Sequence, residues 1–423
     1  MSNANRTESR HRPGGRAAWI ACVALLVAVP AAAQSDRLLY HAETLDGRVL
    51  ASSRADEPFN PASVVKVGTS LWALDAYGPT YRYSTSFGTR VRGDDDRGLV
   101  DLVIRAGGDP DLQLENVFLV AFELARLGIT SLSGGVVVSG DLWCGWEQGV
   151  ERRIEDPVRR APLAGARVRE ALDPRRWSAS TRATWNAMAA RRGFDPSNPA
   201  RVSVRGGVRY EAGSAMEPIV VHRSNPLPPL LKRFNVYSNN DIVRIADVLG
   251  GVDGLESFLV GRLGPGVRLS TASGERTNRM TARQAVELMR DTVGEARTKG
   301  LEPGDVLPVL GCDPGPTRRM FPAFLRPERS GAVAVKTGSL TTTDGGVAVL
   351  AGIARTRDAG EVVFAVAATG TGSDLRPWRQ VEQAWLLDLL ERSGGVVPAA
   401  CGPELPFSDD FAEVVAVADL SGR

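Results

Sequence analysis

The hydrophobic pattern at the start of the chain predicts a β-hairpin followed by a buried helix. Short apolar-rich runs at 38–42 and 48–52 flank Asp46-Gly47, a dipeptide typical of tight hairpin turns. A helical pattern then covers 62–77, with a proline just before it and a glycine just after it, as helix ends favour. Because this segment is largely apolar, we expect the helix to be buried.

The middle of the chain has a weaker pattern. Two strand-like runs between 83 and 105 flank a polar turn at 93–98, and 134–142 has the composition of a further strand. The segment 145–200 is rich in Arg and Pro, and its poor periodicity makes it the least regular part of the chain. We expect 91–217 to form a module inserted into the rest of the fold.

Regular periodicity returns after residue 222 and predicts helices and strands in alternation. The predicted helices are 240–249, 281–293 and 374–391, and the predicted strands are 332–335, 346–354 and 361–368. The last helix is amphipathic. Its acidic content favours packing on a sheet over binding to a membrane surface, because interfacial helices are rich in Lys and Arg.

The first 33 residues have the pattern of a secretory signal peptide. Four arginines precede an apolar run of 14 residues at 17–30, and Ala31-Ala32-Ala33 offers the small residues of a cleavage site. The run is shorter than the roughly 20 residues that span a bilayer. We therefore expect export, to the periplasm or to the extracytoplasmic face of the cell envelope, with retention as an uncleaved anchor as the alternative.

Length, composition and charge narrow the class of protein. A chain of 423 residues suggests two or three domains, and 43% apolar with 24% charged residues excludes collagen-like, coiled-coil and disordered proteins. The formal net charge of +2 becomes −1 without residues 1–33, which hold four Arg and one Glu. A near-neutral chain lacks the electrostatic footprint of a nucleic-acid-binding protein, so we expect no nucleic-acid partner.

Three cysteines follow the leader, at Cys144, Cys312 and Cys401. In an oxidising compartment they allow at most one internal disulfide and leave one thiol, and the sequence does not say which pair forms. There is no C-x-x-C pair and no Cys/His cluster, so we expect no structural zinc site.

The distribution of lysine points to specific chemistry. Only four of the 51 basic residues are lysines, namely Lys66, Lys232, Lys299 and Lys336. A position that keeps lysine against this bias is a candidate for chemistry in which the amine loses its proton, which arginine cannot do. Lys232 and Lys299 lie outside any motif and are taken as ordinary surface lysines.

The other two lysines lie in short motifs. Ser63 and Lys66 are three residues apart near the start of the predicted helix, so they share a face, and a neutral Lys66 amine could take the Ser63 proton. Lys336-Thr337-Gly338-Ser339 follows an apolar strand, where a cation and hydroxyl groups could hold a substrate carboxylate. If Lys336 lies near Lys66, its charge would lower the pKa of Lys66.

A third motif, Ser238-Asn239-Asn240, lies between these two. By composition alone, S-x-x-K is expected about 0.3 times in the chain and K-T-G about 0.02 times, so their joint occurrence in this order is informative. The trio S-x-x-K, S-x-N and K-T-G resembles the signature of the penicillin-recognising serine acyl-transferases.

The resemblance is closest to the low-molecular-mass class C penicillin-binding proteins, which are D-alanyl-D-alanine carboxypeptidase/endopeptidases. It extends over roughly 38–392 and is carried by 60–85, 101–112, 222–227 with 237–240, and 336–340. The chain departs from the family pattern around Ser273-Gly274, where T-A-S-G-E-R stands in place of D-G-S-G-L-S, and at 341–346, which is longer or more polar than usual.

The resemblance implies an α/β fold of the β-lactamase/transpeptidase type, in which helices flank an antiparallel sheet. It implies a discontinuous penicillin-binding transpeptidase-like domain at 34–90 and 218–397. An inserted domain at 91–217 would follow the nucleophile helix, and a C-terminal tail would occupy 398–423.

A catalytic mechanism is also implied by the resemblance. Ser63 would attack the carbonyl of a terminal D-Ala-D-Ala peptide, with Lys66 as base and Ser238 as the relay to the leaving amine. Asn240 would bind the substrate amide. The backbone N–H groups of Ser63 and Ser339 would form the oxyanion hole. Substrate binding at the terminal carboxylate would fall to Lys336, Thr337, Gly338 and Ser339.

The partners implied are peptidoglycan stem peptides ending in D-Ala-D-Ala, with β-lactams as inhibitors. The mechanism needs no cofactor and no metal. A peripheral membrane contact and the oligomeric state stay open, as do the diamino acid of the stem peptide and the choice between trimming termini and cutting cross-links.

Other interpretations stay open at this point. A β-lactamase shares the motifs but positions a deacylating water, often with a Glu, and no Glu stands out here. A non-catalytic peptidoglycan-binding protein is disfavoured by the intact motifs. A Ser-His-Asp hydrolase would need His41 or His222, and neither G-x-S-x-G nor H-E-x-x-H occurs. Ser238 and Asn239 also suit capping of the next helix, and Ser273 suits an ordinary turn.

Overall fold

The computed structural model describes residues 37–92, 99–147 and 153–420. The predicted signal peptide at 1–33 lies outside the described residues. None of the helices in the described ranges combines the length and the hydrophobicity of a membrane span.

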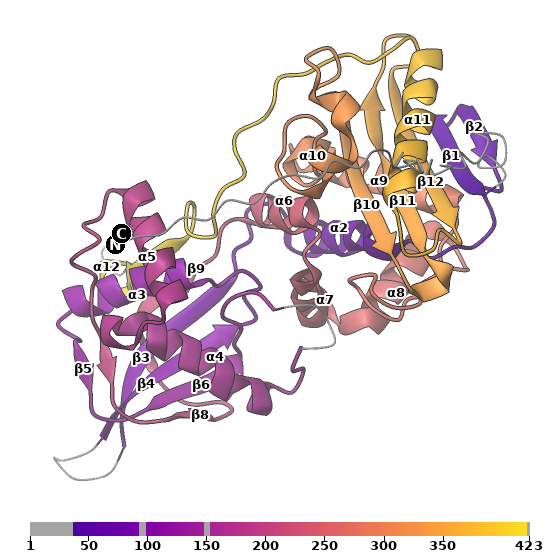
Figure 1. Cartoon of the computed structure of the whole chain (residues 1–423). Helices are drawn as coiled ribbons and strands as arrows, with labels where there is room; N and C mark the ends of the chain where they lie inside the picture. The colour runs from indigo at the N-terminus through magenta and orange to yellow at the C-terminus, as the bar shows by residue number, and fades with distance from the viewer. Residues whose placement is uncertain (1–36, 93–98, 148–152, 421–423) are drawn as a thin grey trace, which may run out of the picture. The chain divides into compact units, whose positions relative to one another are not determined.

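The first sheet combines two strands from the start of the described chain with three strands from residues 333–369 (Figure 1). Its strand order is β10-β11-β12-β1-β2, and every neighbouring pair is antiparallel. The strands are β1 (Leu38–Thr44), β2 (Val49–Ser53), β10 (Val333–Leu340), β11 (Val347–Arg355) and β12 (Glu361–Thr369). The predicted N-terminal hairpin thus pairs with β12, more than 300 residues later in the sequence, and β10 lies at one edge of the sheet.

Helices cover both faces of this sheet. One face packs against α2 (Val65–Tyr77) and α9 (Ala282–Thr298), and the other packs against α11 (Arg376–Arg392). Ala334 belongs to the first core, whereas Val333 and Val335 belong to the second. Alternate residues of β10 therefore face α2 or α11, and this antiparallel sheet flanked by helices confirms the predicted fold. The predicted helix at 374–391 packs on the sheet through its leucines.

The second sheet has its own core. Its strand order is β13-β9-β3-β4-β6-β8. The strands are β3 (Ser84–Arg92), β4 (Leu99–Gly107), β6 (Val136–Asp141), β8 (Val208–Tyr210), β9 (Glu217–Arg223) and β13 (Glu413–Ala416). The helices of this part are α3 (Leu114–Arg126), α4 (Pro157–Leu172) and α5 (Ala179–Arg192), and a short ladder pairs β5 (Ser131–Leu132) with β7 (Ser203–Val204).

The second sheet extends past the boundaries expected for the inserted module. It takes in strand residues from Ser84 onward, continues to Arg223, and gains β13 from the tail. The division into domains stays a prediction, with strands of this sheet running beyond both 91 and 217.

The prediction of little regularity at 145–200 was wrong for α4 and α5. The buried face of α4 is built largely from small residues, including Ala161, Ala164 and Gly165, which carry a weak hydrophobic signal. A proline also lies inside the helix. A Cβ at Gly165 would lie 2.5 Å from Val208 Cγ1, so the small residues let α4 pack closely on β8.

The remaining elements connect these layers. They are α6 (Leu227–Tyr237), α7 (Val243–Leu249), α8 (Gly251–Leu263), α10 (Pro316–Met320), α12 (Val417–Leu420) and the 3₁₀ turns η1 (Ala62–Val64), η3 (Pro174–Arg176), η4 (Asn240–Ile242), η5 (Pro303–Asp305), η6 (Pro322–Leu325) and η7 (Thr343–Gly345). The predicted helix at 62–77 is therefore present, with its first turn in 3₁₀ geometry.

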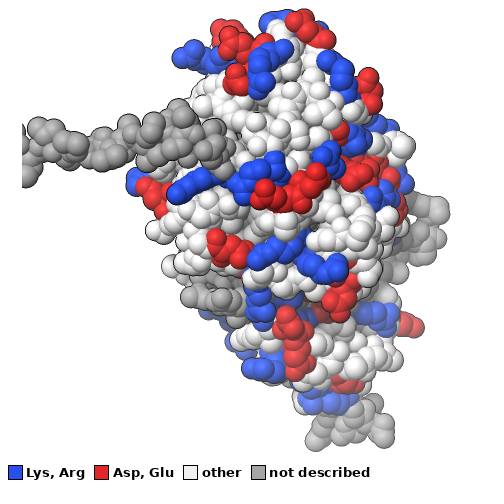
Figure 2. Space-filling view, turned by 90° about the vertical axis from the view of Figure 1, so that its right-hand side faces the viewer, with Lys and Arg blue, Asp and Glu red and all other residues white. Residues whose placement is uncertain are grey.

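One disulfide, Cys312–Cys401, ties the tail to the segment that precedes β10. Cys144 is a buried free thiol. The surface is of mixed charge: on the face shown in Figure 2, Lys and Arg side chains are interspersed with Asp and Glu.

Candidate active site

Ser63 and Lys66 lie together at the junction of η1 and α2. The side chain of Asn60 accepts the Ala62 N–H at 3.0 Å, and Ala62 has a φ of 47°, a left-handed conformation unusual for alanine. This tight turn leads directly into the helix. Lys66 is fully buried, and its Nζ lies 2.7 Å from Ser63 Oγ.

Three oxygens surround the Lys66 amine. Nζ donates to Ser63 Oγ at 2.7 Å, to Asn240 Oδ1 at 2.8 Å and to the Ser273 carbonyl at 2.7 Å. Burial lowers the pKa of Lys66 to about 7, and the negative charge of Glu275 acts in the opposite direction. Near neutral pH a large share of this amine is therefore uncharged and able to accept a proton.

The S-x-N motif turns sharply between α6 and η4. Ser238 ends α6 with a φ of 51°, and the Asn239 side chain accepts the Asp241 N–H at 2.8 Å. The turn directs the two motif residues to different lysines. Asn240 contacts Lys66, as described above, and Ser238 Oγ accepts from Lys336 Nζ at 2.9 Å.

The K-T-G motif runs along the edge strand β10, close to the nucleophile turn. A Cβ at Gly338 would lie 2.6 Å from the Pro61 carbonyl oxygen and 3.0 Å from Ala62 Cβ, so only glycine fits. Lys336 is buried, and its pKa is lowered well below the usual value, first by burial and then by the positive charges of Lys66 and Arg379.

Burial is the leading cause of the low Lys66 pKa. The sequence raised only the charge of Lys336, on the condition that it lay near Lys66. The two lysines do repel each other, and this repulsion helps to lower the pKa of Lys336. Removing an ammonium group from water disfavours its charged form before any neighbour is considered.

The predicted site residues thus meet in two linked groups. Ser63, Lys66 and Asn240 form one hydrogen-bonded set, and Ser238 with Lys336 forms the other. The Ser339 hydroxyl lies on the α11 side of β10, where it accepts a hydrogen bond from Arg379 at 2.5 Å. Its backbone stays on the strand with Thr337 and Gly338.

A wall of the site comes from the turn at 273–275, for which the sequence offered only the departure from D-G-S-G-L-S. Gly274 has a φ of +87°, and a Cβ there would lie 2.1 Å from the Ala62 carbonyl oxygen and 2.7 Å from the Ser63 nitrogen. Ser273 and Gly274 therefore support both the base and the nucleophile, which is more than the ordinary turn considered from the sequence.

Two further contacts could not be found from the sequence. Asp344, in the polar stretch after K-T-G, binds the Asn60 side chain at 2.8 Å and Arg279 at 3.0 Å. Asp241, directly after the S-x-N motif, accepts the Glu147 N–H at 2.9 Å. Both contacts join segments that are far apart in the sequence and follow no local spacing.

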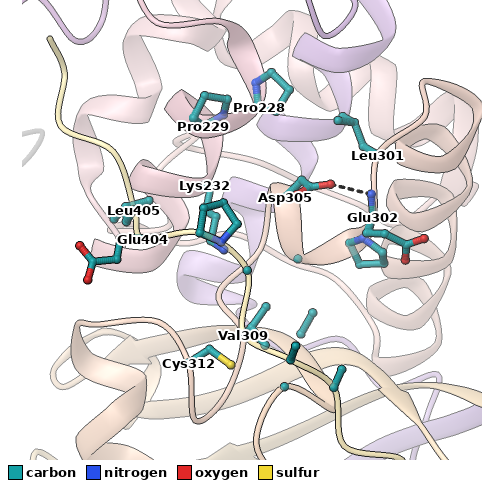
Figure 3. Close-up of a pocket in the computed structure, with 18 of the residues that line it drawn as sticks. Pro228, Pro229, Lys232, Leu301, Glu302, Asp305, Val309, Cys312, Glu404 and Leu405 are labelled. Atoms are coloured by element: carbon teal, nitrogen blue, oxygen red, sulfur yellow. Dashed lines mark hydrogen bonds between the residues drawn. The ribbon is translucent and has the colours of Figure 1, made fainter. Parts of the chain in front are cut away.

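A cavity of about 690 Å³ lies elsewhere, between α6, the segment 301–309, the start of β10 and the tail. Figure 3 shows Lys232, Val309, Cys312 and Leu405 around it. Lys232, taken from the sequence as an ordinary surface lysine, forms an ion pair with Asp313 at 3.1 Å. The lining contains no residue of the three motifs, so the reaction is not assigned to this cavity.

The fold and the serine–lysine site define an active-site serine enzyme of the penicillin-recognising class. The sequence model of the D-Ala-D-Ala carboxypeptidase 3 (S13) family matches residues 23–170 and 200–385, and the chain belongs to that family. The family predicted from the sequence is confirmed, and so is the prediction of a serine-type hydrolase that acts on D-Ala-D-Ala peptides of peptidoglycan.

Solved structures share this fold. A predatory endopeptidase of Bdellovibrio bacteriovorus, in complex with an immunity protein, superposes with a TM-score of 0.74 at 22% identity, covering 88% of this chain and 98% of that chain. A penicillin G-acylated predatory endopeptidase of the same organism gives 0.70 at 22% identity, covering 89% and 98%. Penicillin-binding protein 4 of Haemophilus influenzae gives 0.61 at 18% identity, covering 86% and 99%.

Membership of this family also indicates on which side of the cytoplasmic membrane the protein acts. Peptidoglycan lies outside the cytoplasmic membrane, so an enzyme that acts on it works on the extracytoplasmic side.

Proposed function

We propose that the protein removes the terminal D-alanine of peptidoglycan stem peptides ending in D-Ala-D-Ala, through an acyl-enzyme on Ser63, and that β-lactams inhibit it by acylating the same residue. The observation that carries this proposal is the 2.7 Å contact between Ser63 Oγ and a buried Lys66 amine whose pKa is about 7. A serine is activated as a nucleophile when an amine that is largely unprotonated near neutral pH lies within hydrogen-bonding distance of its hydroxyl.

In the first step Lys66 takes the Ser63 proton while Oγ bonds to the carbonyl carbon of the penultimate residue. The backbone N–H groups of Ser63 and Ser339 receive the oxyanion. The peptide C–N bond then breaks, and the proton passes through Ser238 to the leaving amine of D-alanine. Water attacks the acyl-enzyme in the second step, which restores Ser63 and releases the shortened peptide.

Substrate binding follows from the one charged residue of β10 and from the hydroxyl groups beside it. Lys336 and Thr337 bind the terminal carboxylate together with the Ser339 hydroxyl, while Gly338 leaves room for the strand to approach the nucleophile turn. A carboxylate beside Lys336 would favour its charged form and so offset the burial of the amine. Asn240 holds the substrate amide beside Lys66.

Cleavage of cross-links uses the same atoms with a different leaving amine. Two of the solved structures above are predatory endopeptidases, so we include D,D-endopeptidase action in the proposal. We place the enzyme in the periplasm or on the outer face of the envelope, exported through residues 1–33.

The test is the intact mass of the protein after brief exposure to benzylpenicillin. Wild type should gain one penicilloyl group, and Ser63→Ala should gain none. Ser257→Ala is the matched control, because this exposed serine donates to the Asp253 carbonyl within α8 and belongs to none of the three motifs. It should be acylated like wild type.

The same experiment separates the alternatives. Hydrolysis of penicillin without a lasting adduct would favour a β-lactamase. Neither adduct nor turnover would favour a non-catalytic peptidoglycan-binding protein. D-Alanine release from a pentapeptide, set against cleavage of a cross-linked dimer, then ranks the two peptidase activities.

A further inference from the structure

Arg379 lies against the K-T-G strand from the α11 side of the sheet. It is in the first turns of α11 and only 5% exposed. One terminal guanidinium nitrogen, Nη2, donates to the Gly338 carbonyl oxygen and to Ser339 Oγ, both at 2.5 Å. The other, Nη1, donates to the Val349 carbonyl at 3.1 Å and to Glu382 at 2.6 Å.

The Gly338 carbonyl belongs to the same peptide unit as the Ser339 N–H. Such a unit is planar and trans, so its C=O and N–H point in opposite directions. Gly338 pairs with Val349 across the ladder, and Arg379 joins these two carbonyls. The Gly338 oxygen is therefore directed toward β11, and the Ser339 N–H is directed toward the open edge of the sheet.

We infer that Arg379 is a positioning residue for the oxyanion hole, which fixes the plane of the Gly338–Ser339 peptide and polarises it. The inference rests on the proposed function, in which the Ser339 N–H receives the oxyanion. Hydrogen bonds from a charged donor are roughly twice as strong as neutral ones, and linked hydrogen bonds polarise one another. A peptide whose oxygen is held by a guanidinium is thus a stronger N–H donor.

The same nitrogen also orients the Ser339 hydroxyl. Its Oγ accepts from Arg379, so the hydroxyl hydrogen is directed to another acceptor, and the proposed function supplies one in the substrate carboxylate. Ser339 offers the substrate two donors, its backbone N–H and its hydroxyl. One guanidinium therefore binds both the carbonyl oxygen of the peptide that carries this N–H and the oxygen of the hydroxyl.

Arginine suits this position for a geometric reason. Its planar fork serves two carbonyls on neighbouring strands, a hydroxyl and the carboxylate of Glu382 at once, whereas the ammonium of lysine is a single point with three donors. Glu382 is fully buried and holds the fork in register with the sheet.

The experiment measures the carbonyl stretch of the penicilloyl-enzyme by infrared difference spectroscopy, with ¹³C at the β-lactam carbonyl. This frequency falls as hydrogen bonds draw electron density onto the oxygen, so it reports the strength of the oxyanion hole. The variants are Arg379→Gln and Arg379→Lys. The matched control is Arg376→Gln, on the same helix, whose side chain is 89% exposed and pairs with Asp374.

We expect R379Q to move the stretch to higher wavenumber and to slow acylation by about 10- to 100-fold, less than the 10²- to 10³-fold loss of a whole oxyanion donor. R379K should lie between R379Q and wild type, and R376Q should match wild type. The Ser339→Ala variant, which keeps the Gly338 contact, should raise KM and leave the stretch in place.

Two outcomes overturn the inference in distinguishable ways. Folded R379Q and R379K acyl-enzymes with the wild-type stretch would show that Arg379 does not act on the oxyanion hole. If R379Q does not fold, R379K decides by the same criterion. If wild type and R376Q gain no penicilloyl group at all, the proposed function fails and the inference fails with it.

Discussion

The pH dependence of acylation should move in a known direction when Asn240 is replaced by aspartate. The base is the neutral form of Lys66, so acylation by benzylpenicillin should rise with pH and reach half its plateau near the Lys66 pKa of about 7. Asn240→Asp puts a carboxylate 2.8 Å from Nζ without changing the shape of the side chain.

The size of the effect follows from that distance. At 2.8 Å, two unit charges attract by about 1.5 kcal/mol with the dielectric constant of water and by about 6 kcal/mol with an effective value near 20. At 1.36 kcal/mol per pKa unit, the Lys66 pKa should rise by about 1 to 4 units. Because acylation needs the neutral amine, the rising limb of the profile should move to higher pH by that amount.

The assay is the second-order rate constant of acylation, followed by mass between pH 5 and 10. Glu275→Gln should shift the profile in the opposite direction. It removes a negative charge that raises the Lys66 pKa, so the rising limb should move to lower pH. Glu328→Gln, an exposed glutamate outside the site, is the control and should leave the profile in place. If the rising limb of the N240D profile stays at the same pH as in wild type, Lys66 is not the base. This holds even if the plateau value of the acylation rate constant is lower.

Three further predictions concern stability and backbone geometry. Burial of Lys66 lowers its pKa from 10.5 to about 7, so the unfolded chain binds the extra proton and wild type gains stability as pH rises from 7 to 10.5. Lys66→Met should therefore raise the free energy of unfolding by about 1–3 kcal/mol at pH 7, and urea titrations should show the gain shrinking toward pH 10.5. Gly274→Ala should slow acylation by about 100-fold through displacement of the nucleophile turn. Gly264→Ala, at a φ of +78° with nothing within 4 Å of the new Cβ, controls for backbone strain alone and should acylate like wild type. Cys401→Ser opens a bridge of sequence separation 89 and should cost about 2–4 kcal/mol of unfolding free energy, and an equal stability of wild type and variant without reductant would contradict this.

The sequence was most informative where chemistry depends on local spacing. Ser63 and Lys66 share a helix face, so their contact follows from the i,i+3 relation alone. The K-T-G motif continues an apolar stretch into the strand β10, and the rarity of lysine drew attention to both Lys66 and Lys336. Capping of the next helix, considered for Ser238 and Asn239, is present at Asn239, whose side chain accepts the Asp241 N–H at the start of η4.

The features that could not be predicted from the sequence depend on contacts between segments far apart in the chain. Arg379 meets β10 some 40 residues away in the sequence, and nothing in the α11 pattern distinguishes it from its neighbouring arginines. Asp344 contacts Asn60 over a sequence separation of 284 residues. The buried face of α4 consists largely of alanine and glycine, which give a weak hydrophobic signal. The sequence also could not show how completely the Lys66 amine is buried, because burial is a property of the assembled core.

The three oxygens around the Lys66 amine link its deprotonation to activation of the nucleophile. A protonated amine has three donors and no acceptor, and the three surrounding oxygens satisfy all of them. The neutral amine has a lone pair that needs a donor. Asn240 Oδ1 and the Ser273 carbonyl can only accept, so the Ser63 hydroxyl is the group of the three that can supply a hydrogen. Loss of the Lys66 proton therefore turns the Ser63 O–H toward the amine, which is the geometry from which the proton is transferred when Oγ attacks the substrate.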